Sequence, residues 1–427
     1  MKKYKQNFKR VILHSDCNSF YASVEELYDP SLRGYAVAVC GNPEIRQGII
    51  LARNQRAKKY GIKTGEAVWE AMQKCPELVT VSPHYDLYMQ LGKLCRCVYN
   101  RYSDRVEPMG MDECFLDVSG CEEYLGLSGR EVAEEIRETV KSELGITVSV
   151  GVSFNKVFAK LGSDMRKPDA VTEITEEGFR KEIWGLPADS IIGVGGATYK
   201  KLKSLGVRTL GELARIPPAY MQAKFGKNGV WLWGAVNGLD RSEVMPFGYE
   251  FPVKSIGHGS NALRDLSDNS EVWQFILWLS VELAYRMRRE NKKAYGIAVS
   301  VRDKDLAVSS YRRKLEFATS NDAVIAAEAY RLFCDRHIWR SPLRSLEIRA
   351  IYLDERDAPE QMTLFSDGEA REKRDKLDVT LDMLNLAYGK GTVTRASLLI
   401  GGSMPEMKRE LIMPNSRYMD ADQIMEL

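Results

Sequence analysis

The chain has 427 residues and a formal net charge of +2 at pH 7, a length that predicts about three or four domains at roughly 100–200 residues each. No apolar run approaches the roughly 20 residues that a membrane-spanning helix needs, and the basic N-terminus leads into a predicted strand rather than a signal peptide. The eight cysteines are scattered, so we expect reduced thiols in a cytoplasmic protein without membrane contact. Because the charge is nearly neutral, any nucleic-acid contact must depend on local basic surfaces.

Three acidic residues lie where strands are predicted to begin or end. Residues 11–16 form an apolar run that ends in Asp16, which indicates a buried central strand. Asp112 and Glu113 precede an alternating run, and neighbouring strand residues face opposite sides, so both acids can serve one site only at a turn. Alone they could form an exposed acidic turn. Together with Asp16 they predict hard oxygen ligands for Mg²⁺, with room for two ions about 3.5–4 Å apart.

The first 170 residues alternate between predicted strands and helices. A helix is expected to follow Asp16, with its Phe20-Tyr21 pair either in the core or at the site. A short strand is expected at 37–40, and the basic segment 53–61 is either a solvated helix face or a triphosphate contact. Further helices are predicted at 87–102, at 131–144 and from 155, and a strand at 146–152. This alternation predicts an α+β or α/β domain that contains all three acids.

The rest of the chain predicts a small helical region, a second α+β module and a tail. A glycine-rich turn at 193–196 either binds a phosphate or is simply a tight turn, and 209–239 is predicted to be helical. After a linker near 248–252, we predict a helix at 272–287, strands at 296–301, 309–317 and 343–350, and a helix at 323–333. The basic strand faces of this module suit either a DNA backbone or solvent.

In the polar tail, residues 361–365 predict a docking peptide, because their apolar side chains have nothing local to bury against. One predicted helical face is expected to pack on an unidentified surface, and it carries Leu377, Leu381, Leu384 and Tyr388.

Four segments together resemble the Y-family, or translesion, DNA polymerases, in the group of the bacterial DNA polymerase IV and the DNA polymerase V catalytic subunit: residues 16–26, 111–118, 150–167 and 192–196. The resemblance implies an α+β multidomain, right-hand polymerase with palm, fingers, thumb and little finger. The implied boundaries are palm at 1–22 and 80–170, fingers at 23–79, a helix-hairpin-helix-like thumb at 171–245, little finger at 250–355 and a tail at 356–427.

The same resemblance assigns roles to individual residues. Asp16, Asp112 and Glu113 are implied to be catalytic and to bind two Mg²⁺ ions, with the backbone carbonyl of Cys17 as a further ligand. Tyr21 is implied to be a steric gate against the 2′-hydroxyl of a ribonucleotide. Contacts to the incoming deoxynucleoside triphosphate are implied for Gln55, Lys58 and Lys160. Contacts to primer-template DNA are expected from Gly193, Gly195, Lys200, Arg312 and Arg313, and sliding-clamp contacts from Gln361, Leu364 and Phe365.

Some positions depart from the family pattern. Asn18 replaces a frequent aspartate that is not a metal ligand, and Gln55 and Lys58 stand where tyrosine and arginine are common. Ile49 and Leu51 are bulkier than the small residues that many members place over the templating base, so the sequence does not predict which lesions are bypassed. These departures resemble the polymerase V branch more than the polymerase IV branch.

The resulting hypothesis is template-directed DNA synthesis with low fidelity, in DNA damage tolerance, with mutator activity as a consequence. The alternatives are a catalytically inactive DNA- and clamp-binding subunit, and a palm-type nucleotidyl cyclase.

Overall fold

The computed structural model describes residues 9–46, 48–359, 368–389 and 391–399. They form two compact units: the first contains the residues up to 251 except 42–48, and the second contains 42–48 and the residues from 252 onward. Within these described ranges, every helix is too short or too polar to cross a lipid bilayer.

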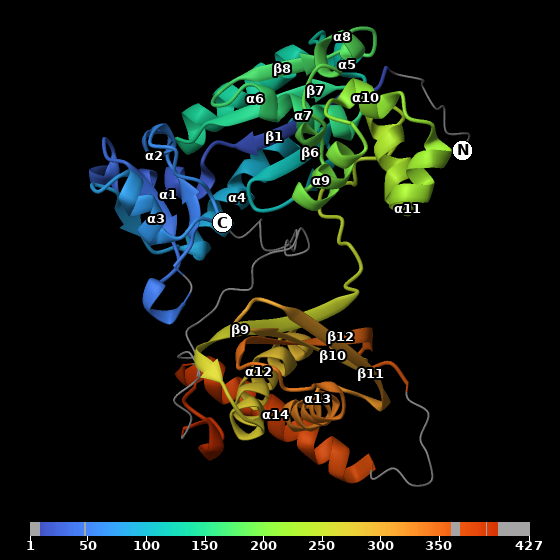
Figure 1. Cartoon of the computed structure of the whole chain (residues 1–427). Coiled ribbons are helices and arrows are strands. Elements are labelled where there is room, and N and C mark those ends of the chain that lie inside the picture. Colours follow the sequence, from blue (N-terminus) through green and yellow to red (C-terminus); the bar gives the residue numbers. More distant parts are fainter. Residues whose placement is uncertain (1–8, 47, 360–367, 390, 400–427) are drawn as a thin grey trace, which may run out of the picture. The chain divides into compact units, whose positions relative to one another are not determined.

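A five-stranded sheet with the order β5-β6-β1-β7-β8 forms the centre of the first unit (Figure 1). Its strands are β1 (Ile12–Cys17), β5 (Val106–Pro108), β6 (Glu113–Asp117), β7 (Val148–Ser153) and β8 (Val171–Ile174). Neighbouring strands are antiparallel except for β7 and β8, which are parallel. Strand β1 is buried along its whole length, which explains its apolar sequence and confirms the central strand predicted at 11–16.

Helices cover both faces of this sheet. Leu13 of β1 belongs to one core cluster with residues of α4 (Tyr85–Asn100) and α6 (Gly129–Leu144). The next residue, His14, points the other way and contacts Ser163 on α7 (Lys156–Met165). Helix α6 begins at a capping box, in which Ser128 and Glu131 bond to each other's backbone N–H groups, and α7 begins at Asn155, whose side chain accepts from Phe158 N–H.

A smaller sheet with the order β3-β2-β4 carries the basic segment predicted at 53–61. Its strands are β2 (Val37–Cys40), β3 (Ile50–Arg53) and β4 (Val79–Val81). The basic residues start at the end of β3 and continue into a short helix, α2 (Gln55–Lys59), which is capped by the side chain of Asn54. The other elements beside it are α1 (Phe20–Tyr28), η1 (Pro30–Leu32) and α3 (Val68–Lys74), and α5 (Cys121–Leu125) follows β6.

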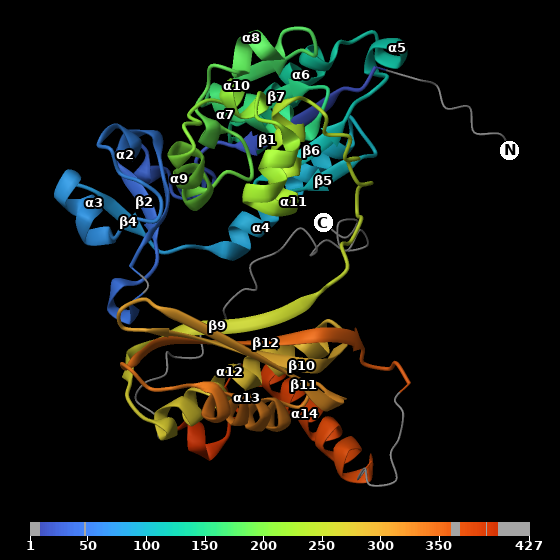
Figure 2. The same ribbon diagram turned by 45° about the vertical axis from the view of Figure 1, so that its right-hand side comes forward.

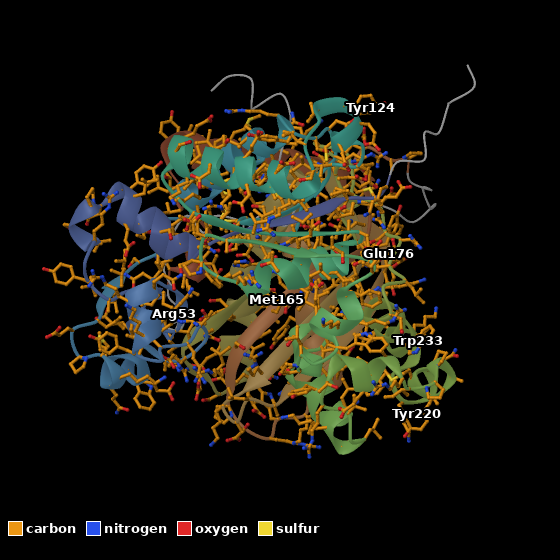
Figure 3. All side chains as sticks on the ribbon, turned by 90° about the horizontal axis from the view of Figure 1, so that it is seen from above. Arg53, Tyr124, Met165, Glu176, Tyr220 and Trp233 are labelled. Carbon is orange, nitrogen blue, oxygen red and sulfur yellow. The ribbon has the colours of Figure 1, made fainter. Side chains whose placement is uncertain are left out.

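The last part of the first unit is helical, as predicted for 209–239. Its elements are α8 (Phe179–Ile183), η3 (Ala188–Ser190), α9 (Gly196–Ser204), α10 (Leu210–Ala214) and α11 (Pro218–Val236). Pro218 occupies the first turn of α11, and Gly226 interrupts that helix at a φ of 63°. These helices share one core, which includes Phe158, Ile183 and Leu232, and α11 carries the Tyr220 and Trp233 labelled in Figure 3.

The second unit is a four-stranded antiparallel sheet with the order β11-β10-β12-β9 and helices on one face (Figure 2). Its elements are β9 (Ser255–Leu266), α12 (Asn269–Arg289), β10 (Lys292–Asp303), β11 (Val308–Thr319), α13 (Asp322–Arg336) and β12 (Leu343–Glu355). The three predicted strands and two predicted helices are confirmed. Strand β9 was not predicted, because Gly257 and Gly259 interrupt its apolar alternation.

The helix predicted near the C-terminus is α14 (Gly368–Tyr388), but the prediction of its packing face was wrong. Leu377 is 57% exposed and Tyr388 is 73% exposed, so this apolar face does not pack as expected. Instead, Asp378 and Asp382 of α14 bind the buried Arg288 of α12 at 3.1 and 2.6 Å. The helix is held by buried charge pairs, which a search for apolar periodicity does not detect.

Candidate active site

The pairing of β1 with β6 brings the three predicted acids to one edge of the five-stranded sheet. Asp16 lies directly opposite Glu113 in the antiparallel register. Asp112 lies in the bend just before β6, and its backbone carbonyl accepts a 3.0 Å hydrogen bond from the N–H of Cys17. The acids therefore come together because one strand ends and its neighbour begins at the same level of the sheet.

Two lysines neutralise part of this charge. The Lys160 ammonium lies 3.1 Å from Asp16 Oδ2 and 2.8 Å from Glu113 Oε1. Lys167 lies 2.8 Å from the same Asp16 oxygen. Burial alone would lower the pKa of Lys160, but the carboxylates of Asp16 and Glu113 raise it, so the amine stays charged.

The carboxyl groups respond to this environment in different ways. Burial raises the pKa of Asp16, although Lys167 and Lys160 oppose that shift. Burial alone would raise the pKa of Glu113, but the neighbouring His14 ring and the hydrogen-bonded Lys160 ammonium favour the charged carboxylate, so its pKa is lowered. Burial and the charges of Asp16 and Glu113 together raise the pKa of Asp112 to about 6.

This donor set fits a hard divalent cation. Its carboxylate oxygens are the ligands that Mg²⁺ prefers, and the Asp112 carboxylate, whose pKa is raised first by burial and then by the charges of Asp16 and Glu113, would be stabilised by a nearby cation. With the Lys160 ammonium between Asp16 and Glu113, no three acidic, histidine or cysteine side chains of the described residues are arranged around one common ion position.

Two contacts at the site involve residues to which the sequence analysis gave no role. His14 is fully buried, its Nδ1 is 2.8 Å from Ser163 Oγ, and its Nε2 is 3.5 Å from Glu113 Oε2. Lys167 is the other. The spacing of His14 and Asp16, two residues apart on one strand, could have indicated that they share a face. Nothing local predicts Ser163 or Lys167 as their partners.

The proposed gate residue, Tyr21, lies among other aromatic rings. Its ring stacks on Tyr88 at 4.2 Å with 9° between the planes, and it meets Tyr85 edge-on at 5.9 Å. Burial, Tyr85 and Asp112 raise the pKa of Tyr21 to about 12, so its hydroxyl is neutral at pH 7 and near the acids. Tyr88 was not singled out in the sequence, since one buried tyrosine in a helix looks like ordinary core.

The basic segment reaches the same site in part. Burial, Arg53 and Lys167 lower the pKa of Lys58, while Asp16 raises it, which places this amine in the field of the acid cluster. The Gln55 side chain lies 3.4 Å from Ser19 Oγ at the start of α1. Asn18 turns away to other partners, bonding Ser149 Oγ at 2.8 Å and accepting from the Asp169 N–H.

The expected DNA-contact residues belong to both units. In the first unit, Gly193 adopts a φ of +90°, which favours glycine, and Gly195 is the N-cap of the helix α9 that carries the exposed Lys200. In the second unit, Arg312 is exposed and Arg313 is not, because adjacent strand residues face opposite sides. Arg313 points to the helix-covered face, where it pairs with Asp335 of α13.

The exposed face of the second unit's sheet carries a row of small and basic residues. Register places Arg312 beside Ala298, Ala298 beside Arg349, and Arg349 beside Gly257. Arg349 also pairs with Glu347 on the same face. The predicted clamp peptide, with Gln361, Leu364 and Phe365, lies outside the described residues.

Models of known protein families match segments of both units. Residues 15–164 match the impB/mucB/samB family, residues 189–240 match the DNA polymerase-iota thumb domain, and residues 253–364 match the impB/mucB/samB family C-terminal domain. A solved Y-family DNA polymerase chimera aligns with a TM-score of 0.70 at 23% identity, over 80% of this chain and 98% of that one.

Curated relatives extend the match to most of the chain. A DNA polymerase IV from Acetivibrio thermocellus is 47% identical over 391 residues, covering 92% of this chain and 98% of the relative. A DNA polymerase IV from Clostridium acetobutylicum is 32% identical, over 91% of this chain and 98% of the relative. DNA polymerase IV 1 from Bacillus subtilis is 34% identical, over 91% of this chain and 93% of the relative.

The mixed α/β multidomain fold, with its thumb and little-finger domains, is therefore that of the Y-family DNA polymerases. The three acids at the edge of the five-stranded sheet lie within the segment that the first family model matches. The chain belongs to the DNA polymerase IV group of this family, the DNA-directed DNA polymerases of translesion synthesis and DNA repair.

The expected polymerase V branch was wrong, because these relatives are named as DNA polymerase IV. The inference depended on a few departures from the family pattern, among them Ile49, whose side chain is 46% exposed. Side-chain identity at a few positions is too local a feature to separate two branches of one fold.

Proposed function

We propose that Asp16, Asp112 and Glu113 hold a pair of divalent cations, Mg²⁺ in the cell, at which a primer 3′-hydroxyl attacks the α-phosphorus of a deoxynucleoside triphosphate. The observation that carries this proposal is the register pair of Asp16 and Glu113, with Asp112 beside them. When bound, the ions would polarise the attacking hydroxyl and stabilise the leaving pyrophosphate. The Cys17 carbonyl, at the end of β1, is the proposed backbone ligand.

The chain's own cations would then act on the triphosphate. Lys160 now bridges Asp16 and Glu113, and its three N–H donors suit non-bridging phosphate oxygens equally well. Lys58 and Gln55, on the basic helix beside the acids, are proposed to contact the β- and γ-phosphates. As the hydroxyl oxygen gives up its proton to water and bonds to the α-phosphorus, the bond from that phosphorus to the bridging oxygen breaks, and these cations would neutralise the departing pyrophosphate.

Tyr21 is proposed as the steric gate. Its half-buried ring lies near Asp112, where the sugar of an incoming nucleotide would sit. A 2′-hydroxyl would meet this ring, whereas the hydrogen of a deoxyribose would not.

DNA binding is proposed to use backbone contacts without sequence preference. Gly193, Gly195 and Lys200 supply N–H groups and a cation at the start of α9. Arg312 supplies an exposed cation on the open sheet face, beside small residues that let a phosphate backbone approach. We no longer propose Arg313 as a DNA contact, because it pairs with Asp335 on the opposite face.

Two further assignments remain proposals. Residues 361–365 are proposed to bind a sliding clamp, on the strength of their sequence alone. The proposed cytoplasmic location is supported by the eight cysteines, all of which are free thiols.

Primer extension with conservative variants tests the cation site. Asp16→Asn and Glu113→Gln preserve size and remove charge, and we expect either to reduce extension in Mg²⁺ by at least about 10³-fold, as expected for loss of a metal ligand. Glu122→Gln, at an exposed glutamate of α5, is the matched control and should extend normally. Robust extension by either site variant would refute the assignment, and an inactive natural chain would favour a DNA- and clamp-binding subunit.

A further inference from the structure

The proposed gate ring of Tyr21 is held by neighbours that none of the assigned roles explains. Its face lies flat against Tyr88, with centroids 4.2 Å apart and 9° between the planes, and the edge of Tyr85 meets it at 87°. Such contacts favour one orientation of a ring over others. The Tyr21 ring therefore has one face covered by the fully buried ring of Tyr88.

Tyr88 is fixed in turn by a buried carboxylate. Its side chain is fully buried, and its hydroxyl donates a short hydrogen bond to Oε1 of Glu25, which is 4% exposed. The same carboxylate has both of its oxygens 3.0 Å from Nδ1 of His84. A buried carboxylate needs such partners, because burying a charge without them is costly.

The position of these residues in the sequence links Tyr21 to Glu25 and to the start of α4. Tyr21 and Glu25 lie four residues apart on α1, so they share a helix face. His84 is the N-cap of α4, and Tyr85 and Tyr88 lie in its first turn or just after it. The Glu25 carboxylate therefore ties the start of α4 to the helix that carries the gate.

We propose that Tyr88, Glu25 and His84 form an anchor that positions the Tyr21 ring and thereby sets the discrimination between deoxyribonucleotides and ribonucleotides. A gate that works by size excludes a 2′-hydroxyl only if the ring cannot turn away from it. The stack on Tyr88 blocks that movement, and the bond to Glu25 stops Tyr88 from moving with it. These are positioning residues that act through Tyr21, and the inference rests on the proposed role of Tyr21 as the steric gate.

A purely structural role for the same residues makes a different prediction. If the anchor only packs α1 against α4, its loss should lower the incorporation of both sugars by the same factor. If it positions the gate, the incorporation of ribonucleotides should rise relative to that of deoxyribonucleotides. The ratio of kcat/KM for a dNTP to kcat/KM for the matching rNTP separates the two, because a general loss of active enzyme cancels in it.

The experiment measures that ratio on one primer-template for the full chain and five variants. Tyr21→Ala tests the gate itself and should remove most of the discrimination. Tyr88→Leu removes the flat backing, and we expect the ratio to fall about 3–10-fold, the fold-change that corresponds to one lost aromatic contact. Tyr88→Phe removes the hydrogen bond between residues 88 and 25 and Glu25→Gln weakens it, while both keep the side-chain shape, and each should lower the ratio by about 2–5-fold. They also keep the test decisive if Tyr88→Leu fails to fold.

The matched control is Tyr99→Phe. Tyr99 is a second buried tyrosine of α4 whose hydroxyl makes one hydrogen bond, to Ser15 Oγ at 2.9 Å. The ratio of kcat/KM for a dNTP to kcat/KM for the matching rNTP should be the same in Tyr99→Phe as in the natural chain. If Tyr21→Ala lowers the ratio and the Tyr88 and Glu25 variants do not, the anchor is overturned while the gate stands. If Tyr21→Ala leaves the ratio unchanged, Tyr21 is not the steric gate, and the proposed role of the anchor is refuted as well.

Discussion

The fit between β7 and α7 offers a sensitive test of how the site is positioned. Gly151 of β7 packs against α7, and a Cβ added there would lie 1.9 Å from the Ala159 carbonyl oxygen and 2.5 Å from the Ser163 nitrogen. The helix would have to move away by more than 1 Å for the first distance to reach even 3.0 Å. Lys160 follows Ala159 on this helix, so Gly151→Ala should draw its ammonium away from Asp16 and Glu113.

The expected magnitude follows from that displacement. Overpacking of this kind typically costs about 1–3 kcal/mol of stability, and a misplacement of about 1 Å at an active site can cost roughly 10²-fold in rate. We therefore expect Gly151→Ala to fold but to lose about 10²-fold in single-turnover primer extension. Gly162→Ala, whose added Cβ would be 3.2 Å from the Gly151 Cα, should show a smaller loss.

Gly185→Ala is the matched control, since no atom lies within 4 Å of the Cβ it would add. Circular dichroism and hydrogen exchange would establish that each variant is folded before rates are compared. A folded Gly151→Ala enzyme that extends primers within about threefold of the natural rate would show that the spacing of α7 from the sheet does not govern the chemistry.

Three other predictions concern Arg288, Lys160 and the pair Arg312 and Arg313. Arg288→Met should leave Asp378 without its cation and lower the stability of α14 against local unfolding by about 3–5 kcal/mol. Hydrogen-exchange mass spectrometry should then show faster exchange in α14. Burial and Asp322 raise the pKa of Asp378 to about 6, so this carboxyl is charged at pH 8 and mostly neutral at pH 5. The stability lost in Arg288→Met should therefore be larger at pH 8, where the charge has no partner, than at pH 5. Equal losses of stability at the two pH values would contradict the charge argument. Lys160→Met should lower kcat/KM for dNTPs by about 10–100-fold, the effect of one lost charged hydrogen bond, and a change under threefold would argue against a triphosphate contact. Arg312→Ala should make the slope of log affinity for DNA against log salt shallower by about 1, whereas Arg313→Ala, at the residue paired with Asp335, should not; similar slopes for both variants would remove the open sheet face from the DNA site.

Local sequence patterns predicted the positions of the three acids well. Asp16 ends an apolar strand, and Asp112 and Glu113 follow a proline and a glycine, so a turn and a strand end could be expected there. The register that places Asp16 opposite Glu113 is a contact between residues 97 positions apart in the chain, and the resemblance to a family supplied what periodicity could not.

The features that were missed depend on partners far away in the sequence. Tyr88 and Glu25 are separated by 63 positions, and His14 and Ser163 by 149, so nothing near either residue indicates the contact. In α14 the prediction followed the apolar stripe, whereas the contacts that hold the helix are charged. A buried ion pair has the same sequence appearance as a solvated one, and only the fold separates them.

The central claim, that Asp16, Asp112 and Glu113 form a cation site, is tested most directly by measuring divalent-ion binding itself. Mn²⁺, which is paramagnetic and accepts the same oxygen ligands, can be titrated into the full chain with primer-template DNA and a non-hydrolysable dNTP, with bound ion followed by electron paramagnetic resonance. We predict two ions per chain, with at least one lost in Asp16→Asn and none lost in Glu122→Gln. Unchanged binding of two ions by Asp16→Asn would contradict the account.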